Sequence, residues 1–242
     1  MSTNVFPGSR RIWMNPLWIV APASVIIFAM GWSNFGPAAG LIGGVGGLVW
    51  VFILAGIVRL IQRSEMLAGS ISTIVLLSAG ATLFLTMGGG IYEYMLMRKA
   101  LATTPEWIVT ITAGPLGEQV ILYFILFNSL LEILLVPLAL LLNWHMPARR
   151  RFVLAAGLIF YAIRIWTYLY FAPQYFDFGQ MTFSEQLVND LMHRMSIDNI
   201  RFVVQIVEAG LFFRAALGPT LSITEGAKLV EQKTLGVSQR MG

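Results

Sequence analysis

The residues best suited to chemistry are charged side chains inside apolar runs. Arg164 lies near the middle of residues 152–173, a run long enough to cross a bilayer. An ionised side chain in hydrocarbon costs roughly 3 kcal/mol on insertion scales, so neighbouring helices must supply a carboxylate or water. Glu132 and Glu208 each lie near the middle of another apolar run. We therefore predict an intramembrane ionic network of Glu132, Arg164 and Glu208.

A second polar group is predicted nearer one membrane face. If successive helices alternate in direction, Glu93 and Arg201 fall at a similar depth toward the outer face. A carboxylate beside a cation and phenols can bind the oxygen of a lipophilic molecule or relay protons. The competing interpretation of both groups is structural, as ion pairs that fix the register of the helices.

The composition is that of a membrane protein. Of 242 residues, 57% are hydrophobic and 12% are charged, whereas soluble domains carry about 25% charged residues. The formal charge of +4 comes from basic residues at the ends of apolar runs, where they set topology. The lipid bilayer is thus the predicted partner, and no nucleic-acid partner is expected.

Metal and cofactor chemistry is not expected. The chain has no cysteine, and the predicted topology puts His145 and His193, its two histidines, on opposite sides of a membrane about 30 Å thick. Carboxylate-only metal binding stays open, although no acidic cluster supports it. Walker, Rossmann, Gly-x-Ser-x-Gly and His-Glu-x-x-His patterns are missing from the sequence. We predict no metal site and no cofactor.

Six apolar runs approach or exceed the length of a spanning helix. A crossing needs about 20 apolar residues, and the runs are residues 16–33, 37–58, 67–97, 119–143, 152–172 and 199–217. The predicted fold is an all-α, polytopic membrane bundle with six transmembrane helices. Most arginines and lysines flank one side of these runs, which places both termini in the cytoplasm.

The runs group into one membrane domain with three predicted parts. Residues 1–66 form an N-terminal transmembrane hairpin, residues 67–217 form a four-helix bundle, and residues 218–242 form a polar cytoplasmic tail. Within the bundle, residues 182–195 repeat an apolar residue every fourth position. They are predicted to form an interfacial helix that lies flat, with its stripe facing lipid or the bundle. Asp198 can then cap the last helix.

One helix is unusually rich in glycine. Overlapping small-xxx-small spacings allow another helix to approach at backbone distance, and they involve Gly40, Gly43, Gly44, Gly46 and Gly47. Two uses stay open, which are close packing within the bundle and an interface with a second copy or a larger membrane complex.

Several short motifs resemble a known family. They are GGGIYE at 88–93, a loop with Pro105 and Trp107, NWHMPARRR at 143–151, TYLYFAP at 167–173, and Arg201 entering the last helix. Over residues 67–217 the chain looks like the anthrone oxygenase-like group of small four-helix integral membrane proteins. Where that family tends to carry an asparagine three residues before the last-helix arginine, this chain has Asp198.

The resemblance implies a specific chemistry. Named members of the group resemble cofactor-independent oxygenases that convert an anthrone to an anthraquinone. By that resemblance Glu93 would be the catalytic base and Arg201 would stabilise the developing phenolate. Tyr92, Tyr168 and Tyr170 would line the binding pocket.

The sequence leaves three functions open. The first is a site in the bundle that binds or oxidises a small lipophilic molecule. The second is a non-catalytic subunit or assembly partner of a larger membrane complex, using the glycine-rich face and residues 182–195. The third, proton- or ion-coupled transport through the intramembrane network, ranks lower because no inverted repeat is visible.

Overall fold

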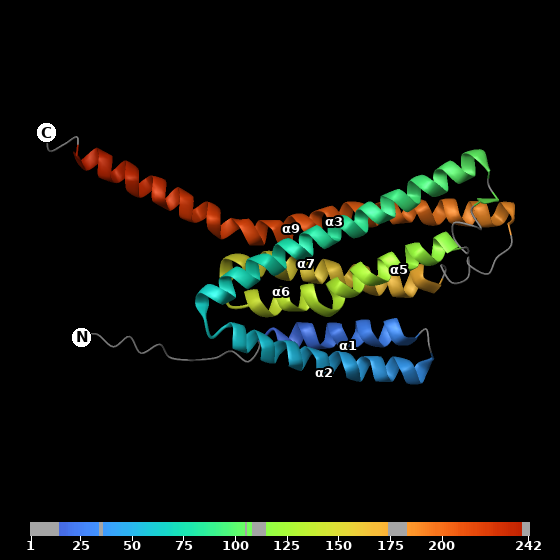
Figure 1. Ribbon diagram of the computed structural model, residues 1–242, viewed down its shortest axis with the longest axis horizontal. Coiled ribbons are helices and arrows are strands. Elements are labelled where there is room, and N and C mark those ends of the chain that lie inside the picture. Colours follow the sequence, from blue (N-terminus) through green and yellow to red (C-terminus); the bar gives the residue numbers. More distant parts are fainter. Residues whose placement is uncertain (1–14, 34–35, 105, 108–114, 174–182, 239–242) are drawn as a thin grey trace.

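The regular structure in the described residues is entirely helical. The computed structural model describes residues 15–33, 36–104, 106–107, 115–173 and 183–238. Its helices, drawn in Figure 1, are α1 (Leu17–Ser33), α2 (Pro37–Ile61), α3 (Glu65–Thr103), α5 (Pro115–Ser129), the π-helical η2 (Leu130–Leu135), α6 (Val136–Asn143), α7 (Pro147–Trp166), the π-helical η3 (Thr167–Phe171) and α9 (Glu185–Ser238).

Four helical stretches in the described part of the chain are long and apolar enough to cross a membrane. They are Pro37–Ile61, Glu65–Thr103, Gln119–Asn143, which joins α5, η2 and α6, and Pro147–Phe171, which joins α7 and η3. Helix α1 is also apolar but shorter, with 17 residues. The predicted all-α membrane bundle is confirmed at this level.

Helices α1 and α2 form a tight hairpin beside the rest of the bundle (Figure 1). The turn between them uses Gly36 at φ 112°, a conformation that other residues rarely adopt. A Cβ atom added at Gly43 would lie 2.5 Å from the carbonyl oxygen of Phe28, and one at Gly47 would lie 2.8 Å from that of Ser24. Helix α1 therefore covers Gly40, Gly43, Gly44 and Gly47, in agreement with the close-packing interpretation, whereas Gly46 is exposed.

Helix α9 packs against both α3 and α7, and α6 contacts α3 and α7 as well. Small residues at the contacts let the backbones approach closely. The shared core is buried apolar surface from all of these helices, including Leu76, Ala79, Leu83, Ala139, Ala156, Phe160, Ala209 and Phe212.

Two adjacent glycines of α3 receive aromatic rings from other helices. Tyr123 of α5 packs against Gly89, and its hydroxyl donates to the carbonyl oxygen of Leu85 at 2.6 Å. A Cβ atom at Gly90 would lie 2.6 Å from the ring of Phe202 on α9. These glycines therefore serve close approach of side chains.

The π-helical segment η2 has a visible cause in the sequence. Pro137 has no N–H to offer the carbonyl of Ile133 four residues earlier, and its ring clashes with an undistorted helix there. The backbone widens instead, and the N–H of Val136 bonds to the carbonyl oxygen of Leu131, five residues earlier. The Ile133 oxygen, to which Pro137 cannot donate, accepts a hydrogen bond of 2.7 Å from Nε1 of Trp50 on α2.

Helix α9 corrects the expectation of a separate interfacial helix at 182–195. The helix runs without interruption from Glu185 to Ser238, and Asp198 lies inside it rather than at a cap. The run Met195–Ser196–Ile197–Asp198–Asn199 contains no glycine or proline to end a helix. The predicted capping box begins at Thr182, outside the described residues, and Ser184 Oγ accepts from the N–H of Leu187 at 3.1 Å.

The apolar stripe at the start of α9 faces the bundle. Leu187 and Leu191 are buried against Met97 and Ala100 of α3. The polar tail predicted from residue 218 onward continues the helix as far as Ser238. Both surfaces assigned to a partner by the subunit hypothesis, the glycine-rich face and this stripe, thus pack largely within the chain.

Candidate functional site

A buried ionic centre lies between α7 and η2. Nε of Arg164 donates to Oε1 of Glu132, and the hydroxyl of Tyr168 donates to the other carboxylate oxygen, Oε2, at 3.0 Å. Arg164 is 8% exposed and Glu132 is 6% exposed. The predicted partner of the buried cation is therefore in place, and both carboxylate oxygens are engaged.

Two irregular stretches of helix present this centre. Glu132 lies in η2 and Tyr168 lies in η3, while Arg164 lies one turn before Tyr168 on the same helix. The guanidinium carbon of Arg164 lies 5.1 Å from the centroid of the Tyr168 ring. π-Helical turns are rare and recur at functional sites. Here η2 and η3 direct the side chains of Glu132 and Tyr168 toward Arg164.

Glu208 approaches this centre without joining its hydrogen bonds. It is 1% exposed on α9 and within electrostatic range of Arg164. Its Oε1 has no hydrogen-bond partner among the residues that the structure describes. The predicted network is therefore a tight pair of Glu132 and Arg164 with Tyr168, and a second carboxyl, that of Glu208, lies nearby.

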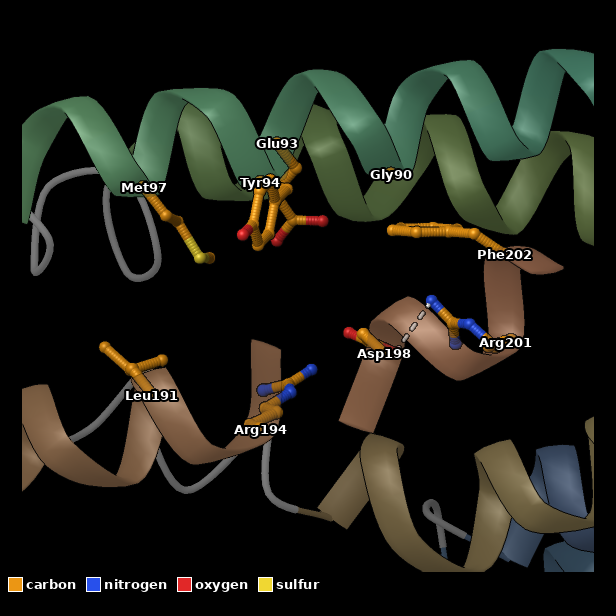
Figure 2. A pocket seen from close by; sticks show the side chains of 9 residues that line it. All are labelled: Gly90, Glu93, Tyr94, Met97, Leu191, Arg194, Asp198, Arg201 and Phe202. Carbon is orange, nitrogen blue, oxygen red and sulfur yellow. Dashed lines mark ion pairs between the residues drawn. The ribbon is translucent and has the colours of Figure 1, made fainter. Parts of the chain in front are cut away.

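A second polar cluster lines a small cavity between α3 and α9. The cavity has a volume of about 30 Å³, enough for about one water molecule. Apolar walls come from Met97, Leu191 and Phe202. Figure 2 shows the polar side chains gathered around the gap between the two helices, namely Glu93, Tyr94, Arg194, Asp198 and Arg201.

Asp198 and Arg201 form the floor of this α3–α9 cleft. Oδ1 of Asp198 lies 3.2 Å from Nη2 of Arg201, one turn along α9. Neither Asp198 Oδ1 nor Arg201 Nε has a hydrogen-bond partner within the described ranges. Burial raises the pKa of Asp198, and the charges of Arg201 and Arg194 oppose that rise.

An aromatic ring supports the two cations. The guanidinium carbons of Arg201 and Arg194 lie 5.0 Å and 5.7 Å from the centroid of the Phe171 ring. Contacts of this kind stabilise a cation by the negative face of the ring. Phe171 is buried at the end of η3, so the same π-helical segment presents a side chain to each polar cluster.

The structure brings Glu93 and Arg201 to one cleft but not Tyr92. Tyr92 is 62% exposed on the outer side of α3, and Tyr94 lines the cleft instead. Residues 90, 93, 94 and 97 share one helical face by their spacing, so the period of α3 could have identified Tyr94. Tyr92, two residues after Gly90, is turned by about 200° from it and points to the opposite side of the helix.

The other two predicted binding tyrosines also lie outside the cleft. Tyr168 bonds to Glu132, as described above. Tyr170 packs its ring against Trp166 and Phe171, with centroids 6.5 Å and 5.0 Å away. Asp198 and Arg194 were missed as cleft residues because the sequence favoured a helix break between them.

No metal centre is formed by the described residues, which contain no group of three or more histidine, cysteine or acidic side chains able to hold an ion. Comparison of the chain with protein-family models, with curated proteins and with solved structures found no match. The function must therefore be inferred from the geometry of the two polar clusters.

Proposed function

We propose that this chain is a multi-pass membrane protein that binds a small lipophilic molecule by its oxygen-bearing end in the α3–α9 cleft. The observation that carries this proposal is a buried Arg201 Nε with no hydrogen-bond partner in the described residues, beside a cavity and next to Asp198 Oδ1, whose ion pair with Arg201 is not a hydrogen bond. A buried polar atom without a partner costs free energy. A ligand that supplies a donor and an acceptor there would recover it.

The size of the cleft determines what enters. A volume of about 30 Å³ accepts a hydroxyl or carbonyl group rather than a whole ring system. The apolar remainder of the ligand would lie outside the cleft, along the apolar surface of α3 and α9. Met97 and Phe202 at the rim supply apolar contacts to it.

Oxidation of a bound phenol is the enzymatic form of this proposal. It rests on the resemblance to the anthrone oxygenase-like group. Glu93 would accept a proton from the ligand, and Arg201 would stabilise the resulting anion. Molecular oxygen would then convert the anthrone methylene to a carbonyl, with the second oxygen atom leaving as water.

Six crossings with both termini in the cytoplasm belong to the same proposal. Helix α1 and residues 199–217 of α9 would add two crossings to the four long apolar stretches. Because the chain has no cysteine, single cysteines at Ser2 and Ser238 can report topology directly. Labelling of both by an impermeant maleimide only after permeabilisation is expected, and labelling of either in intact cells would contradict the topology.

The binding test is extraction of ligand from gently purified protein. Organic extracts of the wild type and of Arg201→Gln are compared by mass spectrometry, and a lipophilic, oxygen-bearing molecule is expected to be lost from the variant. Glu93→Gln tests the base, with the exposed Glu106→Gln as its matched control. The same molecule in wild type and Arg201→Gln at equal amounts would contradict the proposal.

The enzymatic form has a separate readout. Addition of an anthrone should cause oxygen uptake by the wild type that Glu93→Gln abolishes and Glu106→Gln keeps. Binding of the anthrone without oxygen uptake would show that the chain binds the molecule but does not oxidise it. Recovery of a stoichiometric protein partner with no small molecule would favour the alternative of a non-catalytic subunit.

A further inference from the structure

A large groove separates the N-terminal hairpin from the start of α7. It has a volume of about 1160 Å³ and is bounded by α1, α2, α6 and the turn into α7. Figure 1 shows the hairpin lying beside α6 at this end of the molecule. Because Glu93 lies 28 residues beyond the start of α3, roughly 40 Å along the helix, the groove is remote from the α3–α9 cleft.

One end of the groove is polar and cationic. It is lined by Arg59 and Gln62 of α2 and by His145 and Arg150 around the α6–α7 turn. None of its lining residues is acidic, and within the described part of the chain neither arginine forms an ion pair. The guanidinium carbon of Arg150 lies 5.9 Å from the ring centroid of Trp144, another lining residue.

The other end of the groove is apolar. Its walls include Val25 of α1 and Leu48, Phe52 and Ala55 of α2. From Leu48 to Gln62 the groove follows fourteen residues of helix, roughly 20 Å. One leaflet of the hydrocarbon core is about 15 Å thick. The groove is therefore as long as an acyl chain that begins at the membrane surface.

We infer that this groove binds an anionic phospholipid, with the phosphate between Arg59 and Arg150 and an acyl chain along α1 and α2. Arginine side chains recognise phosphate oxygens by paired charge-assisted hydrogen bonds. Gln62 and His145 add donors beside them. Tryptophan is favoured at headgroup depth, and Trp18 and Trp144 both line this groove.

Charge argues against the chain's own N-terminal segment as the occupant. Residues 1–14 carry Arg10 and Arg11 and no acidic residue. A segment of that sign is repelled by Arg59 and Arg150, whereas an anionic headgroup is attracted.

The experiment measures lipid binding to the full chain in detergent micelles by native mass spectrometry. The probes are short-chain phosphatidylglycerol and, as the neutral comparison, short-chain phosphatidylcholine. Phosphatidylglycerol is expected to bind more tightly than phosphatidylcholine. Loss of each groove arginine should weaken the binding of phosphatidylglycerol about fivefold. The variant is R59Q/R150Q, and the matched control is R63Q/R151Q, which removes the same charge from exposed positions nearby.

A second pair of variants tests the apolar half. Ala55→Trp fills the groove and is expected to weaken phosphatidylglycerol binding, whereas Ile57→Trp, on the exposed side of α2, should leave it unchanged. Equal losses in R59Q/R150Q and R63Q/R151Q would mean diffuse surface attraction and overturn the inference. Full competition by glycerol 3-phosphate would assign the site to a soluble phosphate and also overturn it.

The N-terminal segment is tested in the same cysteine-free background. A cysteine pair at Asn4 and Ala55 is oxidised in the full chain. Little disulfide is expected if lipid fills the groove, and complete disulfide formation would overturn the inference in favour of the segment. These readouts do not involve Arg201 or Glu93, so they succeed or fail independently of the proposed function.

Discussion

The indole Nε1 of Trp50 donates a hydrogen bond of 2.7 Å to the carbonyl oxygen of Ile133, joining the N-terminal hairpin to the bundle. Trp50→Phe keeps an aromatic ring but removes the donor, and lipid offers the carbonyl no substitute. We expect the free energy of unfolding in mixed micelles to fall by about 1–2 kcal/mol. Trp32→Phe, at a 49% exposed tryptophan, is the control and should have little effect.

Pro137 is the reason that Ile133 needs this donor. Pro137→Ala restores a backbone N–H four residues after Ile133, so the helix can satisfy its own carbonyl. The loss caused by Trp50→Phe should therefore shrink in the Pro137→Ala background. A double-mutant cycle measures this coupling. Equal losses in both backgrounds would show that Trp50 stabilises the fold by packing alone.

The Glu132–Arg164 pair predicts an asymmetry between single and double variants. Glu132→Gln leaves a buried guanidinium without its counter-charge, and Arg164→Met leaves a buried carboxylate, so each should cost about 3–5 kcal/mol. Glu132→Gln/Arg164→Met removes both charges and should be milder than either single change. Additive losses, measured by resistance to denaturing detergent, would contradict a mutually dependent pair.

Two neighbouring glycines of α2 should respond in opposite ways to alanine. At Gly43 the new methyl group meets backbone of α1, whereas at Gly46 no atom lies within 4 Å. Gly43→Ala should therefore destabilise the hairpin, and Gly46→Ala should be neutral or stabilising by up to about 1 kcal/mol through helix propensity. Thermal unfolding of the purified variants separates the two. A loss at Gly46 would instead mark a contact with another chain.

Asp198 predicts a dependence of stability on pH. Burial raises its pKa, against the charges of Arg201 and Arg194 on its own helix and with Glu93 facing it from α3. The folded state therefore holds this proton more tightly than the unfolded state. Stability should fall as pH rises through the interval that begins at the ordinary aspartate value, about 3.9.

Asp198→Asn removes that titration. The stability of the Asp198→Asn variant should no longer fall as pH rises. At neutral pH this variant should be at least as stable as the wild type. Asp190→Asn, at an exposed position of the same helix, is the control and should keep the wild-type profile. An unchanged profile in Asp198→Asn would contradict the raised pKa.

Sequence alone was sufficient for the helical membrane class and for narrowing the partner of Arg164 to two carboxylates. Long apolar runs indicate spanning helices, because a segment in lipid needs apolar side chains and a backbone whose N–H and C=O groups are all hydrogen-bonded. A lone cation inside such a run demands a carboxylate, and few carboxylates lie in the other runs. That scarcity left Glu132 and Glu208 as the candidates, and the structure pairs Arg164 with Glu132.

Details that depend on rotation about a helix axis were harder to predict. Tyr92 and Tyr94 both adjoin Glu93 in sequence, but only Tyr94 lines the cleft with it, whereas Tyr92 is exposed on the opposite side of α3. The continuity of α9 was missed because a capping pattern can occur inside a helix whose packing maintains it. The hydrogen bond from Tyr168 to Glu132 depends on two π-helical turns, and only the proline behind the first is visible in the sequence.

The two polar clusters share one stretch of α9. Arg201 and Glu208 are seven residues apart, which is two turns of the helix and roughly 10 Å along one face. Because both side chains project from one uninterrupted helix, any rotation of α9 about its axis would move Arg201 and the carboxyl of Glu208 together. The α3–α9 cleft and the surroundings of Arg164 are in this way joined by a single stiff element.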